Sequence, residues 1–433
     1  MKMLEISKEK FEEFASKSPY NNYCQTDNYG ITMTDNGFNY TFIAYTTNNR
    51  EILAAGMFLT KKIGKRYYYS YCPKGFIIDY NDADLVRRFT TNLKKYYRRK
   101  KVIFLKINPE IPIATIDAKK AFEKAKSDNI TILDTLKKNG FKKRKEIEPL
   151  QLLEPKINCL LNLKEYSVNR LDDEIKEKVL NTENKGLELE IADSSKFDDF
   201  FELIKDSTYK SKDYYKNLLI NFKKDNEADL ALVKVNYEKF LITAKKRVED
   251  EQIKNEELNE LLQRDTTEKT LMEKMKSDKV LEEYKQDVIH ATQGLRKNED
   301  TYIAGALVIK HDNKITIIAA DKDKNYDYLN PDYFLYNRLL DMYKEEYEIA
   351  NIGALADDFK DNSQFKEYNQ LKIDFNPTIY EYIGELDLII SEWRFKIVEK
   401  NNLLSNEFSR KRNIDNLQPT TTTYTEEEQE DYI

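Results

Sequence analysis

Two apolar runs, LALVKV at residues 230–235 and YIAGALVI at residues 302–309, have the length and composition of β-strands. Between them, residues 240–295 contain no Pro and a single Gly, Gly294, and they are rich in Glu, Lys, Gln and Leu. Such a composition favours long helices. The two runs therefore predict one β-sheet that is interrupted by a helical insertion.

The insertion has the pattern of two helices that fold back on each other at a polar turn, residues 264–267. Its apolar residues lie on both sides of this turn: Leu258, Leu261, Leu262, Leu271, Met272, Met275, Leu281, Tyr284 and Val288. If these stripes pair, residues 237–297 form an antiparallel coiled-coil arm. A solvated helical spacer without a partner is the alternative.

Short strands alternate with helices on both sides of the arm. In the first part, residues 40–45, 52–59 and 102–105 read as strands and residues 81–99 as a helix with one apolar face. In the later part, residues 315–320 read as a strand, and Asn330-Pro331 is a typical helix start. The predicted fold class is α/β (α+β), with the pattern occurring twice.

We expect a first unit over residues 1–150. The second unit covers residues 151–236 and 298–400, with the arm at 237–297. Residues 401–433, which contain four consecutive Thr and Glu426-Glu427-Glu428, are expected to be the end of a helix and a disordered acidic tail.

Composition narrows the class of protein. The chain has 433 residues, and 71 Lys and Arg against 77 Asp and Glu give a net charge of −6, which argues against a globally basic nucleic-acid binder. Three Cys without CxxC spacing favour reduced thiols. No signal-like core or stretch of roughly 18 apolar residues is present, so we expect a cytoplasmic protein. Peripheral contact with the inner face of the membrane is left open.

Several common catalytic patterns are missing. His290 and His311 are the only histidines, and neither has a metal ligand at a suitable spacing. Neither G-x-G-x-x-G nor GxxxxGK[ST] occurs. We therefore expect no metal and no cofactor, and an enzyme with this sequence would act by positioning an activated donor beside its acceptor.

One expected helix carries a dense group of basic residues with Tyr96 and Tyr97 between them. The group comprises Arg87, Arg88, Lys94, Lys95, Arg98, Arg99, Lys100 and Lys101. Such a patch attracts phosphates, although a solvated helix face would have the same composition. Lys210 and Lys212 form a second, smaller group.

Several segments, taken in order along the chain, resemble the motifs of the Fem family (FemABX). Gln25-Thr26-Asp27-Asn28-Tyr29 is similar to Q-[ST]-x-x-W, the stretch from Lys74 to Tyr80 to [RK]-G-[PF]-x-x-D-Y, and Leu105-Lys106-Ile107-Asn108-Pro109 to L-K-I-D-P. Asn139-Gly140-Phe141-Lys142 is similar to L-G-F-K, Ile352-Gly353 to an F-G-G turn, and the stretch from Tyr382 to Asp387 to K-I-G-E-F-D. The resemblance covers residues 1 to about 395.

The resemblance implies a fold of two GNAT-like (acetyltransferase-like) subdomains with an inserted arm. It implies a peptidyltransferase that moves an amino acid from aminoacyl-tRNA to the stem or bridge peptide of a peptidoglycan precursor. Its partners would be aminoacyl-tRNA and a lipid-linked or UDP-linked muropeptide, with membrane contact through the lipid-linked form. A homo-oligomer is compatible with this interpretation.

The resemblance also suggests site residues. The precursor is expected near Lys210, with Lys74 and Lys106 as weaker candidates, and near the motif residues Gln25 and Tyr29. The backbone N–H groups of Ile352 and Gly353 are candidate oxyanion donors. The tRNA is expected at the arm and at the basic helix, on Arg87, Arg88, Lys94, Lys95, Arg98 and Arg99. For a general base, Glu381 and Asp79 are candidates, each with an equally good structural explanation.

Some positions depart from the family motifs. Met33 occupies a position where the family often has Lys. Asn108 replaces the Asp of L-K-I-D-P, and Leu180 occupies a position where the family has Arg. These departures keep two alternatives open. One is a catalytically weakened Fem-like binding protein. The other is a GNAT-like acyltransferase with a different donor, although the acyl-CoA signature [RQ]-x-x-G-x-[GA] is not evident.

Overall fold

Two mixed β-sheets form the body of the protein in a computed structural model, which describes residues 1–143, 155–208, 210–264, 267–297 and 301–400. The first sheet contains, in spatial order, β1 (Lys2–Glu5), β2 (Asn39–Thr46), β3 (Ile52–Ile63), β4 (Tyr67–Cys72), β6 (Val102–Ile107), β17 (Leu386–Ile389) and β9 (Phe141–Lys143), with β5 (Ile77–Ile78) beside β3. The second contains β11 (Leu187–Ala192), β12 (Ala228–Val235), β13 (Tyr302–His311), β14 (Lys314–Lys322), β15 (Ile349–Leu355), β10 (Ile157–Asn162), β16 (Thr378–Tyr382), β7 (Pro112–Asp117) and β8 (Glu123–Lys126).

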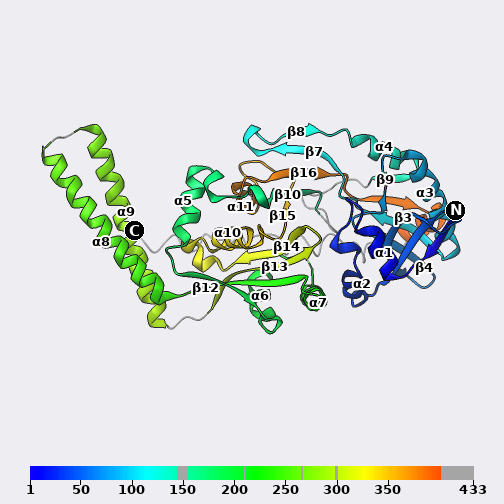
Figure 1. Cartoon of the computed structure of the whole chain (residues 1–433), viewed down its shortest axis with the longest axis horizontal. Helices are drawn as coiled ribbons and strands as arrows, with labels where there is room; N and C mark the ends of the chain where they lie inside the picture. Colours follow the sequence, from blue (N-terminus) through cyan, green and yellow to red (C-terminus); the bar gives the residue numbers. More distant parts are fainter. Residues whose placement is uncertain (144–154, 209, 265–266, 298–300, 401–433) are drawn as a thin grey trace, which may run out of the picture.

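Helices cover the sheets and extend the molecule at one end (Figure 1). They are α1 (Lys8–Ala15), α2 (Asp27–Thr34), α3 (Ala83–Arg99), α4 (Ile130–Lys138), α5 (Asp173–Thr182), α6 (Phe197–Ile204), α7 (Lys212–Lys223), α8 (Tyr237–Arg264), α9 (Glu268–Lys297), α10 (Pro331–Tyr343), α11 (Lys366–Asp374) and α12 (Glu392–Lys400). Among the described residues, none of these helices is long and apolar enough to cross a membrane.

The apolar run at residues 230–235 lies in β12, the second strand from one edge of the second sheet. Leu230 and Leu232 belong to the core under α6 and α7, whereas Ala231 and Val233 belong to the core on the α10 side. Both faces of β12 are therefore covered at residues 230–233, which explains why these four residues are all apolar and do not alternate with polar ones. β12 pairs antiparallel with β13, so the strands before and after the insertion are neighbours, as predicted.

The insertion is an antiparallel helical pair. Tyr237 at the start of α8 packs against Gly294 near the end of α9, and Asn255 donates a hydrogen bond to Ser277 at 3.1 Å. The arm projects from the body at the end farthest from the first sheet (Figure 1). The predicted arm is therefore confirmed.

The interior of the arm differs from the predicted apolar stripes. Leu258 is buried, but Leu261, Leu271, Met272 and Met275 are 50%, 47%, 61% and 64% exposed. Polar residues take their place between the helices: Glu251, Asn255, Ser277 and Asp287 are buried. The stripe prediction was thus wrong toward the tip, because hydrogen bonds between polar side chains hold this seam together.

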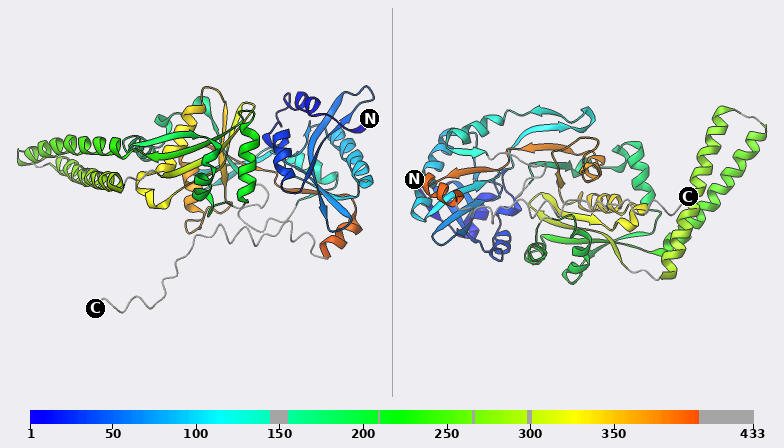
Figure 2. Two further views of the ribbon diagram at one scale, coloured as in Figure 1. Left: turned by 90° about the horizontal axis from the view of Figure 1, so that it is seen from below. Right: turned by 180° about the vertical axis from the view of Figure 1, so that it is seen from behind.

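The two sheets exchange strands. β17 follows the second sheet in sequence but pairs with β6 and β9 of the first, and the hairpin β7–β8 pairs with β16 of the second. In both views of Figure 2, β17 and α12, drawn in orange to red, lie beside the blue N-terminal elements. A division at residue 150 therefore describes the order of elements along the chain but not the membership of the sheets. The expected tail at residues 401–433 lies outside the described residues.

Candidate active site

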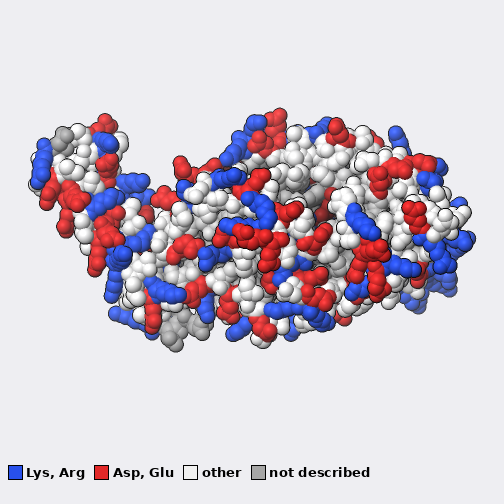
Figure 3. Space-filling view, viewed as in Figure 1, with Lys and Arg blue, Asp and Glu red and all other residues white. Residues whose placement is uncertain are grey.

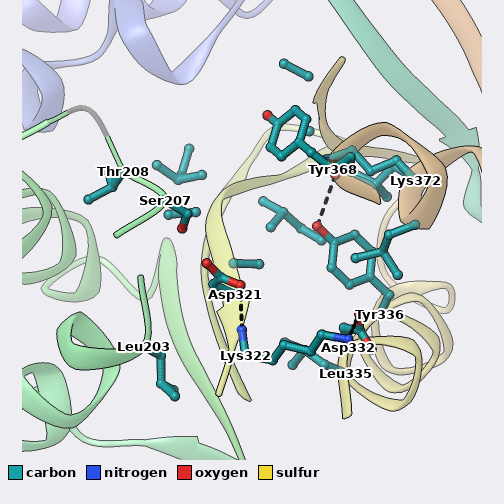
Figure 4. Close-up of a pocket in the computed structure, with 18 of the residues that line it drawn as sticks. Leu203, Ser207, Thr208, Asp321, Lys322, Asp332, Leu335, Tyr336, Tyr368 and Lys372 are labelled. Carbon is teal, nitrogen blue, oxygen red and sulfur yellow. Dashed lines mark hydrogen bonds and ion pairs between the residues drawn. The ribbon is translucent and has the colours of Figure 1, made fainter. Parts of the chain in front are cut away.

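A cavity of about 2020 Å³ lies on the second sheet and reaches the junction with the first. Residues of β14, β15, α10, α11 and the segment before α7 line it, as the close-up in Figure 4 shows. At one end it includes Lys74 and Glu110 from the first half of the chain. At the other end it includes Lys234, Thr301 and Tyr302, which flank the base of the arm. The cavity thus runs from the junction of the two sheets to the arm.

Four of the predicted site residues line this cavity: Lys74, Lys210, Ile352 and Gly353. They come from three separate segments of the chain, since Ile352 and Gly353 are neighbours in β15. Gln25, Tyr29, Lys106 and the basic residues of α3 are not among the residues that line it. The structure therefore brings together two of the expected precursor-binding lysines and the two expected oxyanion donors in one cavity. The other predicted site residues lie outside its wall.

Lys74 is held at the junction of the two sheets. Its ammonium lies 3.2 Å from Glu110, whose other carboxylate oxygen accepts hydrogen bonds from Lys314 at 3.2 Å and Asn22 at 3.0 Å. Burial alone would raise the pKa of Glu110, but Lys314 and Lys74 outweigh it and lower the pKa to about 2. At neutral pH this cluster is a fixed, charged connection between the two sheets.

Gln25 and Asn108 support the turn that carries Lys74. The Gln25 amide donates to the carbonyl of Pro73 and accepts from the N–H of Met57 at 2.7 Å. The side-chain oxygen of Asn108 accepts from the N–H of Lys74 at 2.8 Å, and Lys74 has a left-handed φ of 58°. Tyr29 is 2% exposed and packs edge-on against Tyr23, which does line the cavity. Gln25 and Tyr29 thus act one layer behind the cavity wall.

Lys106 lies inside the first sheet. Its ammonium is 2.9 Å from both Glu385 and Asp387, and its side chain is 1% exposed. Asp387 stands directly opposite Lys106 in the β17–β6 register. The motif lysine therefore joins the exchanged strand to the first sheet and is remote from the cavity surface.

Backbone geometry is unusual at Gly353. Its φ of 112° is open to glycine and strained for other residues, and a Cβ there would lie 3.0 Å from the side chain of Lys372. The N–H of Gly353 donates to the side chain of Asn351 at 3.0 Å, and the carbonyl of Ile352 faces the Tyr336 hydroxyl at 3.5 Å. The turn is therefore ordered by its own neighbours.

Lys372, which sequence reasoning missed, lies against this turn. It projects from α11, is 6% exposed, and donates a hydrogen bond to the carbonyl of Tyr368 at 2.9 Å. Its ammonium also lies 3.5 Å from the centre of the Tyr368 ring. Burial lowers the pKa of Lys372 to about 8, while Cys159 and Asp321 oppose this change. The site thus contains a buried cation that is mostly protonated at neutral pH.

Acidic and basic side chains meet beside this turn (Figure 4). The ammonium of Lys322 lies 2.8 Å from Asp332 and 3.0 Å from Asp327. Asp321 precedes it in β14 and also lines the cavity. Lys210, in the wall near α7, lies 4.5 Å above the ring of Tyr214. The cavity is therefore polar, with both signs of charge.

The two candidate general bases lie elsewhere. Glu381 forms ion pairs with Lys124 at 2.9 Å, which connects β16 to β8, and with Lys156 at 3.2 Å, which connects β16 to the residue before β10. Asp79 is exposed and accepts a hydrogen bond from the N–H of Asn81 at 2.9 Å. Neither lines the cavity. Among the described residues, no group of three or more His, Cys, Asp or Glu could hold a metal ion.

The basic helix α3 lies in the first half of the molecule, at the opposite end from the arm (Figure 1). Arg87 and Arg88 pair with Asp84 at 2.5 and 2.9 Å, and Lys94 is half-buried, which lowers its pKa. Lys95, Arg98 and Arg99 are exposed. On the face shown in Figure 3, positive and negative side chains are interspersed over the body and the arm.

The two mixed sheets and the helices that cover them form an α/β fold, and this fold is similar to that of FemX. The crystal structure of FemX superposes with a TM-score of 0.69 and 18% identity, over 92% of this chain and 100% of that chain. This match confirms the predicted fold class.

Residues 6–401 match the FemAB family, and the chain belongs to this family. Among its relatives, "Aminoacyltransferase FemA" of Staphylococcus epidermidis is 21% identical over 406 residues, which cover 89% of this chain and 95% of the relative. "Aminoacyltransferase FemA" of Staphylococcus aureus is 23% identical over 275 residues, which cover 60% of this chain and 64% of the relative. The predicted resemblance is confirmed.

Proposed function

We propose that the protein is an aminoacyltransferase that transfers an amino acid from aminoacyl-tRNA to the stem or bridge peptide of a peptidoglycan precursor. Membership of the FemAB family and the aminoacyltransferase names of its relatives support the class of reaction. One observation carries the proposal: Lys372 lies against the Gly353 turn in a cavity that also includes Lys74 and Lys210. A cation and an ordered turn beside a large polar space suit acyl transfer.

The reaction would be the aminolysis of an ester. The acceptor amine, once deprotonated, forms a C–N bond to the aminoacyl carbonyl carbon, and the ester C–O bond breaks. The ribose oxygen leaves and takes up a proton. We propose that the ammonium of Lys372 stabilises the negative oxygen of the tetrahedral intermediate, since the N–H of Gly353 is already bonded to Asn351.

We propose that the donor and the acceptor enter from opposite ends of the cavity. The end next to the arm contains Lys196, whose ammonium lies 5.6 Å from the centre of the Tyr302 ring, and this cation–aromatic pair suits a single-stranded tRNA end. Lys210 and Lys74 are proposed to face the precursor. The α3 residues remain a separate proposed tRNA surface. Membrane contact is proposed only through a lipid-linked acceptor.

The test is a transfer assay with glycyl-, alanyl- and seryl-tRNA and with both lipid-linked and UDP-linked precursors. We expect transfer with at least one pair, and a loss of about 100-fold or more in kcat for Lys372→Met, as when a preorganised oxyanion contact is removed. A wild-type protein that binds the precursor without transfer would instead support the weakened binding protein. Transfer from acyl-CoA alone would support the GNAT-like alternative.

A further inference from the structure

Asp321 is a carboxylate in the cavity wall that the proposed chemistry does not use. It lies near the end of β14, where it pairs in register with Gly305 of β13. The N–H of Lys322 donates to its carboxylate at 2.8 Å, and the hydroxyl of Ser207 lies within hydrogen-bonding reach. Figure 4 shows Asp321 and Ser207 on neighbouring parts of the wall.

The nearby lysine does not neutralise this carboxylate. The ammonium of Lys322 is bound by Asp332 and Asp327. Within the part of the chain that the structure describes, no Lys or Arg nitrogen lies within 4.0 Å of the Asp321 carboxylate. Asp321 therefore has hydrogen-bond donors around it but no cation in contact.

Burial without a cation in contact is unfavourable for a charged carboxylate. Burial raises the pKa of Asp321, and the nearby hydrogen bonds offset this only in part. A positively charged ligand in contact with Asp321 would offset the unfavourable free energy of burying its charged carboxylate. Asp321 is also close enough to Lys372 for its charge to raise the pKa of that lysine, so both side chains act on the same part of the cavity.

We propose that Asp321 binds a primary ammonium group of a substrate, with Ser207 orienting its carboxylate. The inference rests on the proposed function, whose two substrates both carry such a group. The aminoacyl donor has an ammonium on the carbon next to its ester carbonyl, and the acceptor amine is an ammonium before it attacks. A carboxylate near Lys372 would hold either one close to the reacting carbonyl. No bond to Asp321 is made or broken.

Ligand binding to the full-length protein tests the subsite without any transfer. Alaninamide carries the ammonium, and lactamide replaces it with a hydroxyl. At about pH 6.5, where an α-amine is protonated, we expect the wild-type protein to bind alaninamide about tenfold or more tightly in ligand-detected NMR, as for a hydrogen bond to a charged group. Asp321→Asn should remove this preference, whereas Asp327→Asn, which alters an exposed carboxylate of the same cavity, should keep it.

Two binding results would overturn the inference: equal affinity of the wild-type protein for both amides, or a preference that persists in Asp321→Asn. If Asp321→Asn does not fold, Ser207→Ala provides the second variant, with a smaller loss of preference expected. An unchanged preference in a folded Ser207→Ala protein would then count against the proposed orientation of the carboxylate. None of these results depends on transfer, so they separate this inference from the proposed function.

Transfer kinetics identify which substrate supplies the ammonium. If it is the donor, the wild-type protein should prefer alanyl-tRNA to lactyl-tRNA, or another matched pair, by about tenfold or more in kcat/KM, and Asp321→Asn should lose this preference. If it is the acceptor, the donor preference should persist and the acceptor KM should rise by a similar factor. Both quantities unchanged in a folded Asp321→Asn protein would overturn the inference.

Discussion

The side-chain ammonium of Lys372 is buried, so little water is available to stabilise its positive charge. Burial lowers its pKa to about 8, so the proton is lost within an accessible pH range. If the charge stabilises the intermediate, the transfer rate should fall as the pH rises through about 8, because the neutral amine cannot do so. A pH profile of kcat measures this fall.

The pH profile of the variant Lys372→Arg should be compared with that of the wild-type protein. A guanidinium stays protonated, so any activity that remains in this variant should lack the fall near pH 8. If the wild-type rate instead rises through pH 8 and this rise is absent from Lys372→Arg, then Lys372 acts as a base, and the proposed role of its positive charge is wrong.

Glu110 makes a pH-dependent contribution to the stability of the junction. Lys314 and Lys74 overcome its burial and lower its pKa from 4.5 to about 2. The contribution is therefore complete above about pH 4.5 and is lost as the pH falls toward 2, with a size of a few kcal/mol. Urea unfolding should show Glu110→Gln to be less stable than wild type at pH 7, with a difference that shrinks between pH 4.5 and 2. A constant difference would contradict this explanation.

At the scale of single residues, the sequence allowed some of the site to be predicted. The short motifs around Lys74 and Gly353 point to cavity residues because their turns require particular backbone conformations. Lys372 carried no such signal, since a lysine on a helix is usually exposed. The burial of Lys106 in the first sheet could not be predicted. Its partners, Glu385 and Asp387, lie just before and within β17, about 280 positions later, and no local pattern indicates that pairing.

Among the elements, the arm depends on a close contact at its base. A Cβ on Gly294 would lie 2.1 Å from the ring of Tyr237. Replacing glycine by alanine inside a helix normally stabilises it by up to about 1 kcal/mol. Here overpacking against a buried ring should cost about 1–3 kcal/mol, so the net effect is destabilising.

Hydrogen exchange of α8 and α9 measures this effect. We expect faster exchange at the base of the arm in Gly294→Ala and little change in β12 and β13. The double variant Gly294→Ala/Tyr237→Ala should exchange more slowly than Tyr237→Ala alone, since the clash is gone and the helix propensity remains. Equal exchange in wild type and Gly294→Ala would show that the ring moves away at no cost.

The basic helix α3 makes a testable contribution to tRNA binding. Arg98 and Arg99 are exposed in its last turn, whereas Arg87 is bound by Asp84. If α3 contacts phosphates, Arg98→Ala/Arg99→Ala should weaken tRNA binding and reduce the slope of log affinity against log salt by about 1–2. Arg87→Ala is the matched control and should change the slope less. If the double variant binds tRNA with unchanged affinity, the basic face of α3 is a solvent-exposed surface that does not contact tRNA.

For the whole molecule, the exchanged strands join the two sheets into one cooperative body. β17 cannot leave the first sheet without pulling on β16, and the hairpin β7–β8 is paired with β16 in turn. We expect the two sheets to unfold together, with coincident urea midpoints for β6 and β13 in hydrogen exchange coupled to mass spectrometry. Two separated midpoints would show independent units.

The fold class and the arm could be predicted because they depend on local patterns: apolar runs, helix composition and turn residues. The exchange of strands could not. The apolar alternation in a strand shows which face is buried but not which strand is its neighbour. The polar seam of the arm was missed for a similar reason, since Glu251 and Ser277 look like surface residues until their hydrogen bond of 2.6 Å is seen.

The position of β17 in the sequence also constrains when the first sheet can be completed during synthesis on the ribosome. β6 emerges early, yet its neighbour in the sheet, β17, is synthesised only after the arm and all nine strands of the second sheet. Throughout that interval one edge of β6 has no native partner, and an unpaired edge recruits other strands. We expect nascent chains stalled before residue 386 to aggregate or to bind chaperones, and chains stalled well beyond β17 to be protected.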